Sequence, residues 1–89
     1  MKTVTLNGAR MTSVETTHQY IAYKLRFPKY YGGNLDALWD ILSTESEPIL
    51  IRLVNTDRMN QSLGDYAKLV LNVIYEAAAE NKKIHVKII

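Results

Sequence analysis

The chain has 89 residues, of which 47% are hydrophobic and 22% are charged, the proportions of a folded globular protein rather than a disordered one. The 11 Lys and Arg outnumber the 9 Asp and Glu, giving a net charge of +2, and the absence of cysteine excludes disulfides, thiolate nucleophiles and cysteine-ligated zinc. No apolar run approaches the ~20 residues that cross a bilayer, and the polar start does not resemble a secretion signal, so we expect a cytoplasmic protein with a single domain over residues 1–89.

Strand-like and helix-like segments alternate along the chain. In chain order they are a strand at 3–6, helices at 13–25 and 35–42, a strand at 49–54, a helical turn at 57–63, a helix at 66–80 and a strand at 84–89. Residues 49–54 are almost continuously apolar, which favours a strand buried on both faces. Because long helical segments separate the strands, we expect parallel pairing, and therefore an α/β fold with a three-stranded parallel sheet and about four helices.

Polar residues at the predicted helix starts indicate how the helices are capped. Thr12 or Ser13 is expected to cap the first helix and Asp65 the last, because short polar side chains accept hydrogen bonds from the free helical N–H groups. Asn34 has the same position before the second helix. One apolar face of the first helix is predicted to consist of Val14, Ile21 and Leu25.

The second helix has two chemically different faces. Its leucines share one face, and polar residues recur on the opposite face at Asp36, Asp40, Ser43 and Glu47. Asp40 lies one turn beyond the like charge of Asp36, which costs about 0.2–0.5 kcal/mol, and no Lys or Arg lies within one turn to offset it. Trp39 is expected to be exposed beside these carboxylates. The pattern fits either a solvated helix face or a surface that binds another protein, where aromatic residues are enriched.

The segment from Tyr30 to Asp40, which reads Tyr-Tyr-Gly-Gly-Asn-Leu-Asp-Ala-Leu-Trp-Asp, closely resembles the signature of the barstar family of intracellular ribonuclease inhibitors. The resemblance extends over the whole chain, including Asn7-Gly8, Pro28, Pro48 and the pair Glu76-Ala77 with Glu80. It implies a barstar-like domain, monomeric when free, that binds a basic, barnase-like ribonuclease one to one and needs no cofactor or metal.

The resemblance also implies which residues contact the enzyme. By position they are Tyr30, Gly32, Asn34, Leu35, Asp36, Trp39, Asp40 and Ser43, with Glu76 and Glu80 at the edge. The helix Asn34–Leu42 and the loop before it would cover the active site, with the Asp40 carboxylate in place of an RNA phosphate. Two features depart from the family pattern, the net positive charge and the lack of a second tryptophan in residues 44–47, and both leave the identity of the partner open.

Three other functions are compatible with parts of the sequence. An enzyme is disfavoured because Asp36 and Asp40, on one helix face, cannot flank a substrate, and because His18 and His85 fit no catalytic or metal-ligand spacing and are expected to be structural. RNA binding is suggested by basic and aromatic residues that interleave at Tyr23, Lys24, Arg26, Phe27, Lys29 and Tyr30, although Phe27 and a tyrosine also fit a role in closing the core. A barstar-like module that gives immunity to a different basic toxin is the third alternative.

Overall fold

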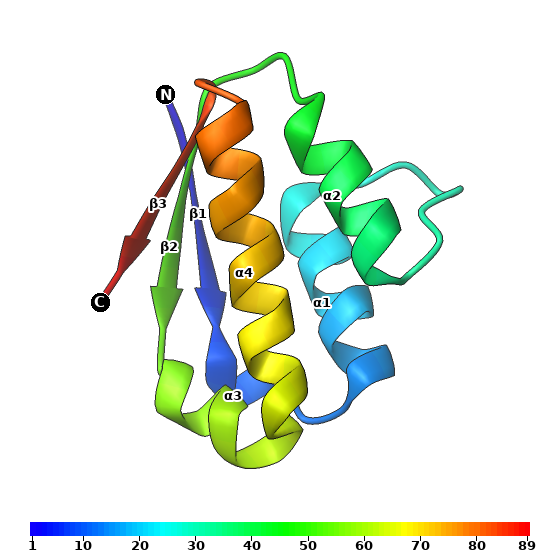
Figure 1. The fold of residues 1–89 in the computed structure, drawn as a ribbon, viewed down its shortest axis with the longest axis vertical. Helices are drawn as coiled ribbons and strands as arrows, with labels where there is room; N and C mark the ends of the chain where they lie inside the picture. Colours follow the sequence, from blue (N-terminus) through cyan, green and yellow to red (C-terminus); the bar gives the residue numbers. More distant parts are fainter.

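A three-stranded parallel sheet forms one side of the molecule (Figure 1). The computed structural model describes residues 1–89. In sheet order, the strands are β1 (Lys2–Asn7), β2 (Ile49–Val54) and β3 (Ile84–Ile88). Thr3 in β1 lies opposite Leu50 in β2, which in turn lies opposite His85 in β3. The predicted α/β fold with a parallel three-stranded sheet is therefore confirmed.

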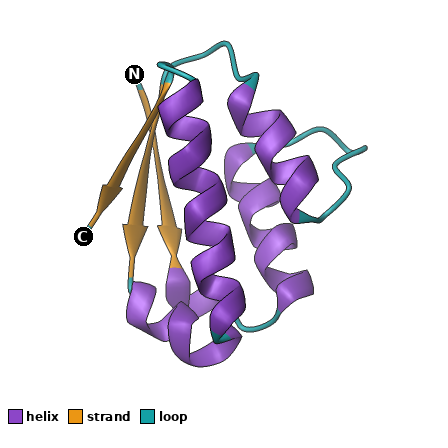
Figure 2. Cartoon of the chain, in the orientation of Figure 1, coloured by secondary structure: helices purple, strands orange, loops and turns teal.

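Four α-helices and a short 3-10 helix connect the strands (Figure 2). They are η1 (Gly8–Arg10), α1 (Val14–Leu25), α2 (Leu35–Ser43), α3 (Thr56–Leu63) and α4 (Asp65–Glu80). Both crossovers between strands advance in the same direction across the sheet, and because such crossovers are right-handed, their helices lie on the same face. None of these helices combines the length and hydropathy that crossing a membrane requires.

The central strand β2 is buried on one face only, and the expectation of burial on both faces was wrong. Ile49, Ile51 and Leu53 are buried against the helices, whereas the side chains between them are half-buried. Both crossovers place their helices on the same face of the sheet, so no helix covers the other face of β2. There the guanidinium of Arg52 donates a hydrogen bond to the Thr5 hydroxyl at 3.1 Å, so neighbouring strand side chains shield this face in part.

The helix starts confirm two predicted caps and correct one. In α1 the Ser13 hydroxyl accepts a hydrogen bond from the Thr16 N–H at 3.1 Å. In α4 the cap position belongs to Gly64, and Asp65 is instead the first helical residue, where its charge interacts favourably with the helix dipole. Val14, predicted on the buried face of α1, is 46% exposed because it lies in the first turn, before the part of the helix that packs on the core.

The carboxyl ends of β1 and β2 meet in a contact that only glycine permits. A Cβ atom at Gly8 would lie 2.3 Å from the carbonyl oxygen of Asn55, the residue that follows β2. Beside this contact, the side-chain oxygen of Asn7 accepts hydrogen bonds from the main-chain N–H of Ala9 and from the side-chain amide of Asn55, both at 2.9 Å. The segment Asn7-Gly8 therefore fixes the start of α3 against the sheet.

Candidate functional site

Helix α2 exposes its carboxylates because its leucines are buried on the opposite side. Leu38 and Leu42 are 0% and 1% exposed and belong to the core, whereas Asp36 and Asp40 are exposed. The contacts of α2 are made mainly with α4, so the helix lies at the outside of the helical layer. The burial of one face thus fixes the direction in which the two carboxylates point.

Local hydrogen bonds close α2 at both ends. The Asn34 side chain accepts from the Ala37 N–H at 2.8 Å, as predicted. At the other end, the hydroxyls of Ser43 and Thr44 donate to the Asp40 carbonyl at 3.3 and 2.6 Å. These bonds use the main chain of Asp40 and leave its carboxylate for a partner or for water.

The acidic face is shorter than predicted. Helix α2 ends at Ser43, one residue later than predicted. Glu47 nevertheless lies beyond this end, in the loop before β2, and does not continue the helical row. In that loop the Glu45 carboxylate accepts a hydrogen bond from the Glu47 N–H at 3.2 Å. The helix itself therefore contributes two carboxylates, Asp36 and Asp40.

Trp39 is half-buried, and its expected exposure was wrong. Its ring packs against the core together with Leu35, which precedes it by one helical turn on the same edge of α2. Trp39 thus lies at the boundary between the apolar and acidic faces of α2. A ring held in this way offers one fixed edge to a partner and loses little conformational freedom on binding.

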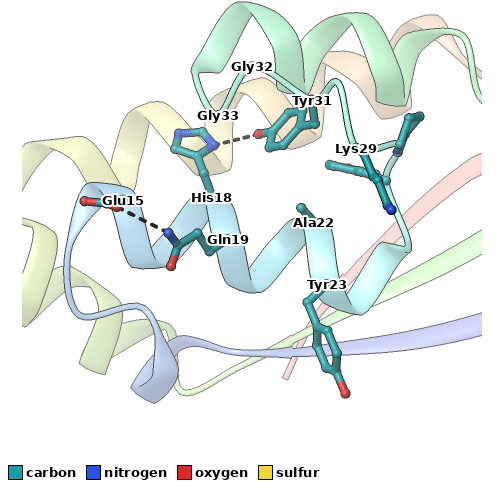
Figure 3. Close-up of a pocket in the computed structure, with 11 residues that line it drawn as sticks. Glu15, His18, Gln19, Ala22, Tyr23, Lys29, Tyr31, Gly32 and Gly33 are labelled. Atoms are coloured by element: carbon teal, nitrogen blue, oxygen red, sulfur yellow. Dashed lines mark hydrogen bonds between the residues drawn. The ribbon is translucent and has the colours of Figure 1, made fainter.

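The loop before α2 combines exposed residues with one anchored tyrosine (Figure 3). Tyr30 is 84% exposed, and Gly32 and Gly33 are exposed after it. Tyr31 points inward: its hydroxyl lies 2.6 Å from Nδ1 of His18 on α1, and its ring packs edge-on against Phe27 at 4.9 Å between centroids. A tyrosine beside Phe27 in the core agrees with the sequence-based expectation.

His18 joins the loop to two helices. Its Nδ1 contacts the Tyr31 hydroxyl, and its Nε2 lies 2.7 Å from the hydroxyl of Tyr66 on α4. Burial lowers the pKa of His18 and raises the pKa of Tyr66. Burial together with the nearby Tyr66 raises the pKa of Tyr31 to about 12. The imidazole is therefore neutral at pH 7, donating to one hydroxyl and accepting from the other.

This buried triad was not predicted from the sequence, although a signal was present. His18 lies three residues before Ile21 and seven before Leu25, which is the spacing of one helix face. A histidine on an apolar face needs polar partners, and those partners come from segments that are distant in the sequence. An open pocket of about 520 Å³ between α1 and the loop reaches His18 from the surface (Figure 3).

Glu76 and Glu80 lie on α4, the helix that packs along α2, and both are exposed. The two helices are fastened together at their carboxyl ends, where the Asn81 side chain donates to the carbonyls of Leu42 and Glu45 at 2.9 Å each. The structure therefore places eight of the predicted contact residues in one continuous segment. The two glutamates lie on the neighbouring helix.

The exposed carboxylates of α2 suit recognition of a cationic surface. The structure brings together no group of three His, Cys, Asp or Glu residues that could hold a metal ion. Both ring nitrogens of His18 are paired with tyrosine hydroxyls, and His85 is exposed on β3. What remains at the surface is a rigid acidic helix beside an exposed tyrosine and a partly exposed tryptophan, the mixture found at the centre of protein interfaces.

Comparison with known proteins gives a consistent result. The family model for Barstar, described as barstar (barnase inhibitor), matches residues 1–89. A protein of Bacillus subtilis (strain 168) named "Putative ribonuclease inhibitor YrdF" is 42% identical over 83 residues, which cover 92% of this chain and 91% of that protein. The similarity thus covers the sheet, the acidic helix and the helix beside it.

Proposed function

The chain belongs to the barstar family, and on this premise we propose that it inhibits a basic, barnase-like ribonuclease by covering the active site with α2 and the loop before it. The family description and the name of the bacterial relative support a role as a ribonuclease inhibitor, not as an enzyme. The observation that carries the proposed mechanism is the exposed pair Asp36 and Asp40 on a helix whose other face is buried.

The proposed contact surface consists of the loop, α2 and the adjoining edge of α4. Its members are Tyr30, Gly32, Asn34, Leu35, Asp36, Trp39, Asp40 and Ser43, with Glu76 and Glu80 at the edge. Charged groups of one sign on this surface would meet the opposite sign around the active site of a ribonuclease, which must attract the RNA phosphates. We also propose that residues 1–89 act as one domain, monomeric when free and cytoplasmic.

Asp40, exposed on α2, is the proposed mimic of an RNA phosphate. Its carboxylate accepts hydrogen bonds from charged donors in the same way as a phosphate oxygen, and such bonds are stronger than those between neutral groups. Within the free protein it gains no partner on its own helix and stands one turn from Asp36. A charge that does not stabilise the free protein supports a role in binding.

The anchored loop supports tight binding by reducing the entropy lost on association. Because Tyr31 is bound to His18 and packed on Phe27, the neighbouring residues Tyr30 and Gly32 are held near one conformation before the partner arrives. Preorganisation of this kind increases affinity without adding a contact.

A titration of the purified chain against a barnase-type ribonuclease tests the proposal. We expect activity to fall to zero at one inhibitor per enzyme, and a non-hydrolysable oligonucleotide to compete with the inhibitor for the active site. The double variant Asp36→Asn, Asp40→Asn should fail to inhibit, whereas the matched double variant Asp57→Asn, Asp65→Asn should inhibit normally. Binding of the chain to the enzyme that is undiminished at saturating oligonucleotide would contradict occlusion of the active site.

The net charge of +2 favours a second candidate partner within the same mechanism. An inhibitor with little overall negative charge gains less long-range attraction to a basic enzyme than an acidic one does. A different basic toxin, whose complex does not depend on very fast association, is therefore an alternative target. If no barnase-type enzyme is inhibited, capture of a partner from the source organism with the native chain, and not with the Asp36→Asn, Asp40→Asn variant, would identify such a toxin.

A further inference from the structure

A basic groove runs along the free edge of the sheet, beside the end of α1. Its volume is about 620 Å³, and it is lined by Lys2, Thr3, Val4, Thr5, Lys24 and Arg26. A smaller hollow of about 400 Å³ continues from it past Tyr23, whose side chain is 81% exposed. Three cations and no carboxylate line the groove, so its charge is opposite to that of the acidic face of α2.

The main chain of β1 offers unpaired hydrogen-bonding groups in this groove. The Lys2 N–H donates to the Pro48 carbonyl, so alternate residues of β1 direct their N–H and C=O groups toward β2. The corresponding groups of Thr3 and Thr5 face the open edge, because no strand lies beyond β1. Farther along, the Tyr20 hydroxyl accepts a hydrogen bond from the Asn7 N–H at 2.9 Å and closes the edge there.

Arg26 lines this groove and has a strained backbone conformation. It follows the last residue of α1 with φ 56° and ψ 48°, a left-handed conformation that glycine adopts most readily. An arginine in place of the favoured glycine is an observed backbone outlier from which a functional role can be inferred. Its exposed side chain adds charge to the groove instead of stability to the helix end.

We propose that the groove between β1 and the end of α1 binds a short acidic peptide segment of a partner protein, which adds to β1 as a fourth strand. The N–H and C=O groups of Thr3 and Thr5 would pair with the main chain of the segment. Its carboxylates would lie beside Lys24, Arg26 and Lys2. In strand addition the main-chain hydrogen bonds supply affinity and the side-chain contacts supply specificity.

The groups at the edge favour a peptide over a nucleic acid. A strand edge alternates donors and acceptors, and a peptide strand satisfies both kinds. A phosphate backbone would pair only with the donors and would be repelled by the outward carbonyls of Thr3 and Thr5. The site is also distinct from the proposed inhibitory surface, since none of its residues belongs to α2 or α4 and Arg26, at the start of the connection from α1 to α2, is not one of the proposed contact residues. The proposal therefore stands whether or not the chain inhibits a ribonuclease.

Binding of a capped peptide, Glu-Val-Glu-Val-Glu, followed by two-dimensional amide NMR, tests the proposal. We expect saturable shifts at Thr3 and Thr5 and slower hydrogen exchange of their amides. Since an exposed ion pair is worth at most about fivefold in affinity, the double variant Lys24→Ser, Arg26→Gly should bind about 5–25-fold more weakly. The matched double variant Arg58→Ser, Lys68→Ser, which removes two charges from exposed positions on α3 and α4, should bind like the native chain.

Two further probes decide the mode of binding and the class of ligand. The same peptide with every main-chain amide methylated should not bind, because both of its edges then lack the donors that strand pairing needs. Equal binding would overturn strand addition. A hexauridylate RNA that binds at Thr3 and Thr5 more tightly than the peptide would assign the groove to nucleic acid and overturn the proposal. Arg26→Gly should be at least as resistant to urea as the native chain, because glycine adopts this backbone conformation without strain. Urea unfolding of the double variant Lys24→Ser, Arg26→Gly is measured beside it, and a folded double variant under the binding conditions shows that its weaker binding does not come from unfolding.

Discussion

The buried triad of His18, Tyr31 and Tyr66 and the acidic face of α2 are both polar, yet their polar groups are used differently. In the triad every ring nitrogen has a hydroxyl within 2.7 Å, so the polar groups are satisfied inside the protein. On α2 the carboxylates of Asp36 and Asp40 lie one turn apart and are exposed. The first region should therefore serve stability and the second binding, and each role can be tested separately.

The largest effect is expected for Asp40→Ala. Binding to the target enzyme should weaken by roughly 2–5 kcal/mol or more, because cations of the active site would lose their partner in a buried contact. Stability should stay the same or rise by about a few tenths of a kcal/mol, since repulsion is relieved and alanine favours the helix. Calorimetric binding and urea unfolding of the same sample measure the two quantities.

The control for this substitution is Asp57→Ala, in the first turn of α3 and away from the proposed surface. It should leave inhibition almost unchanged while lowering stability slightly, because a carboxylate near a helix start is favourable. If Asp40→Ala instead unfolds the protein while its folded fraction inhibits normally, Asp40 is structural and the contrast between the two regions fails.

His18→Leu is expected to have the next largest effect, and on stability first. Leucine fills a similar space but leaves the hydroxyls of Tyr31 and Tyr66 without their partner, which should reduce the unfolding free energy by about 1–3 kcal/mol. Adding Tyr31→Phe and Tyr66→Phe should recover much of the loss, because no unsatisfied hydroxyl remains. A triple variant that is less stable than the single variant would show that packing, not hydrogen bonding, holds the triad.

The stability of the triad should also depend on pH. Burial lowers the pKa of His18 below its ordinary value of 6.5, so above pH 6.5 the imidazole is neutral in both the folded and the unfolded chain. As the pH falls below 6.5, the unfolded chain binds a proton that the folded chain resists, and stability declines until the folded pKa is reached. One proton gives a slope of at most about 1.4 kcal/mol per pH unit.

The measurement is the difference in unfolding free energy between the native chain and His18→Leu at pH 7.5, 6.5 and 5.5. That difference should shrink toward the acid end, because only the native chain carries the buried imidazole. His85 is exposed and present in both proteins, so its contribution cancels. A difference in unfolding free energy that stays constant over the three pH values would mean that His18 is not desolvated in the folded protein.

The smallest expected effect is the repulsion between Asp36 and Asp40. A double-mutant cycle with alanine at both positions should give a coupling of about 0.2–0.5 kcal/mol that destabilises the free protein. Added salt should reduce this coupling, since exposed charges are screened. A favourable coupling would show that the two carboxylates share a partner within the fold, which would weaken the contrast with the triad.

How far the sequence predicted the structure depended on whether the signal was local. The bounds of α2 followed from Asn34 and the leucine spacing, and the core strand at 49–54 was recognised because its apolar run is continuous. The one-sided burial of that strand could not be predicted in the same way, because it depends on which direction both crossovers take across the sheet. Such information is carried by the topology, not by any short segment.

The candidate site was predicted unevenly for the same reason. The acidic face of α2 is visible in a single helical turn, and the family resemblance placed its residues in the proposed contact surface. The exposure of Trp39 was overestimated, because its burial depends on packing against the rest of the core. The link from Tyr31 through His18 to Tyr66 connects residues 13 and 48 positions apart and was not foreseen.

The packing of α2 on α4 has a consequence for how the protein is made. During translation α2 leaves the ribosome well before α4, and its leucines then have no surface to cover them. Similarly, β1 cannot pair until β2 has been synthesised, because Lys2 lies opposite Ile49 and Asn7 opposite Val54. A nascent chain interrupted before Asn81 would lack the side chain that fastens α4 to the end of α2. The orientation of the acidic helix is therefore set late in synthesis, and a ribosome that stalls in the last third of the message would yield a chain without its binding surface in place.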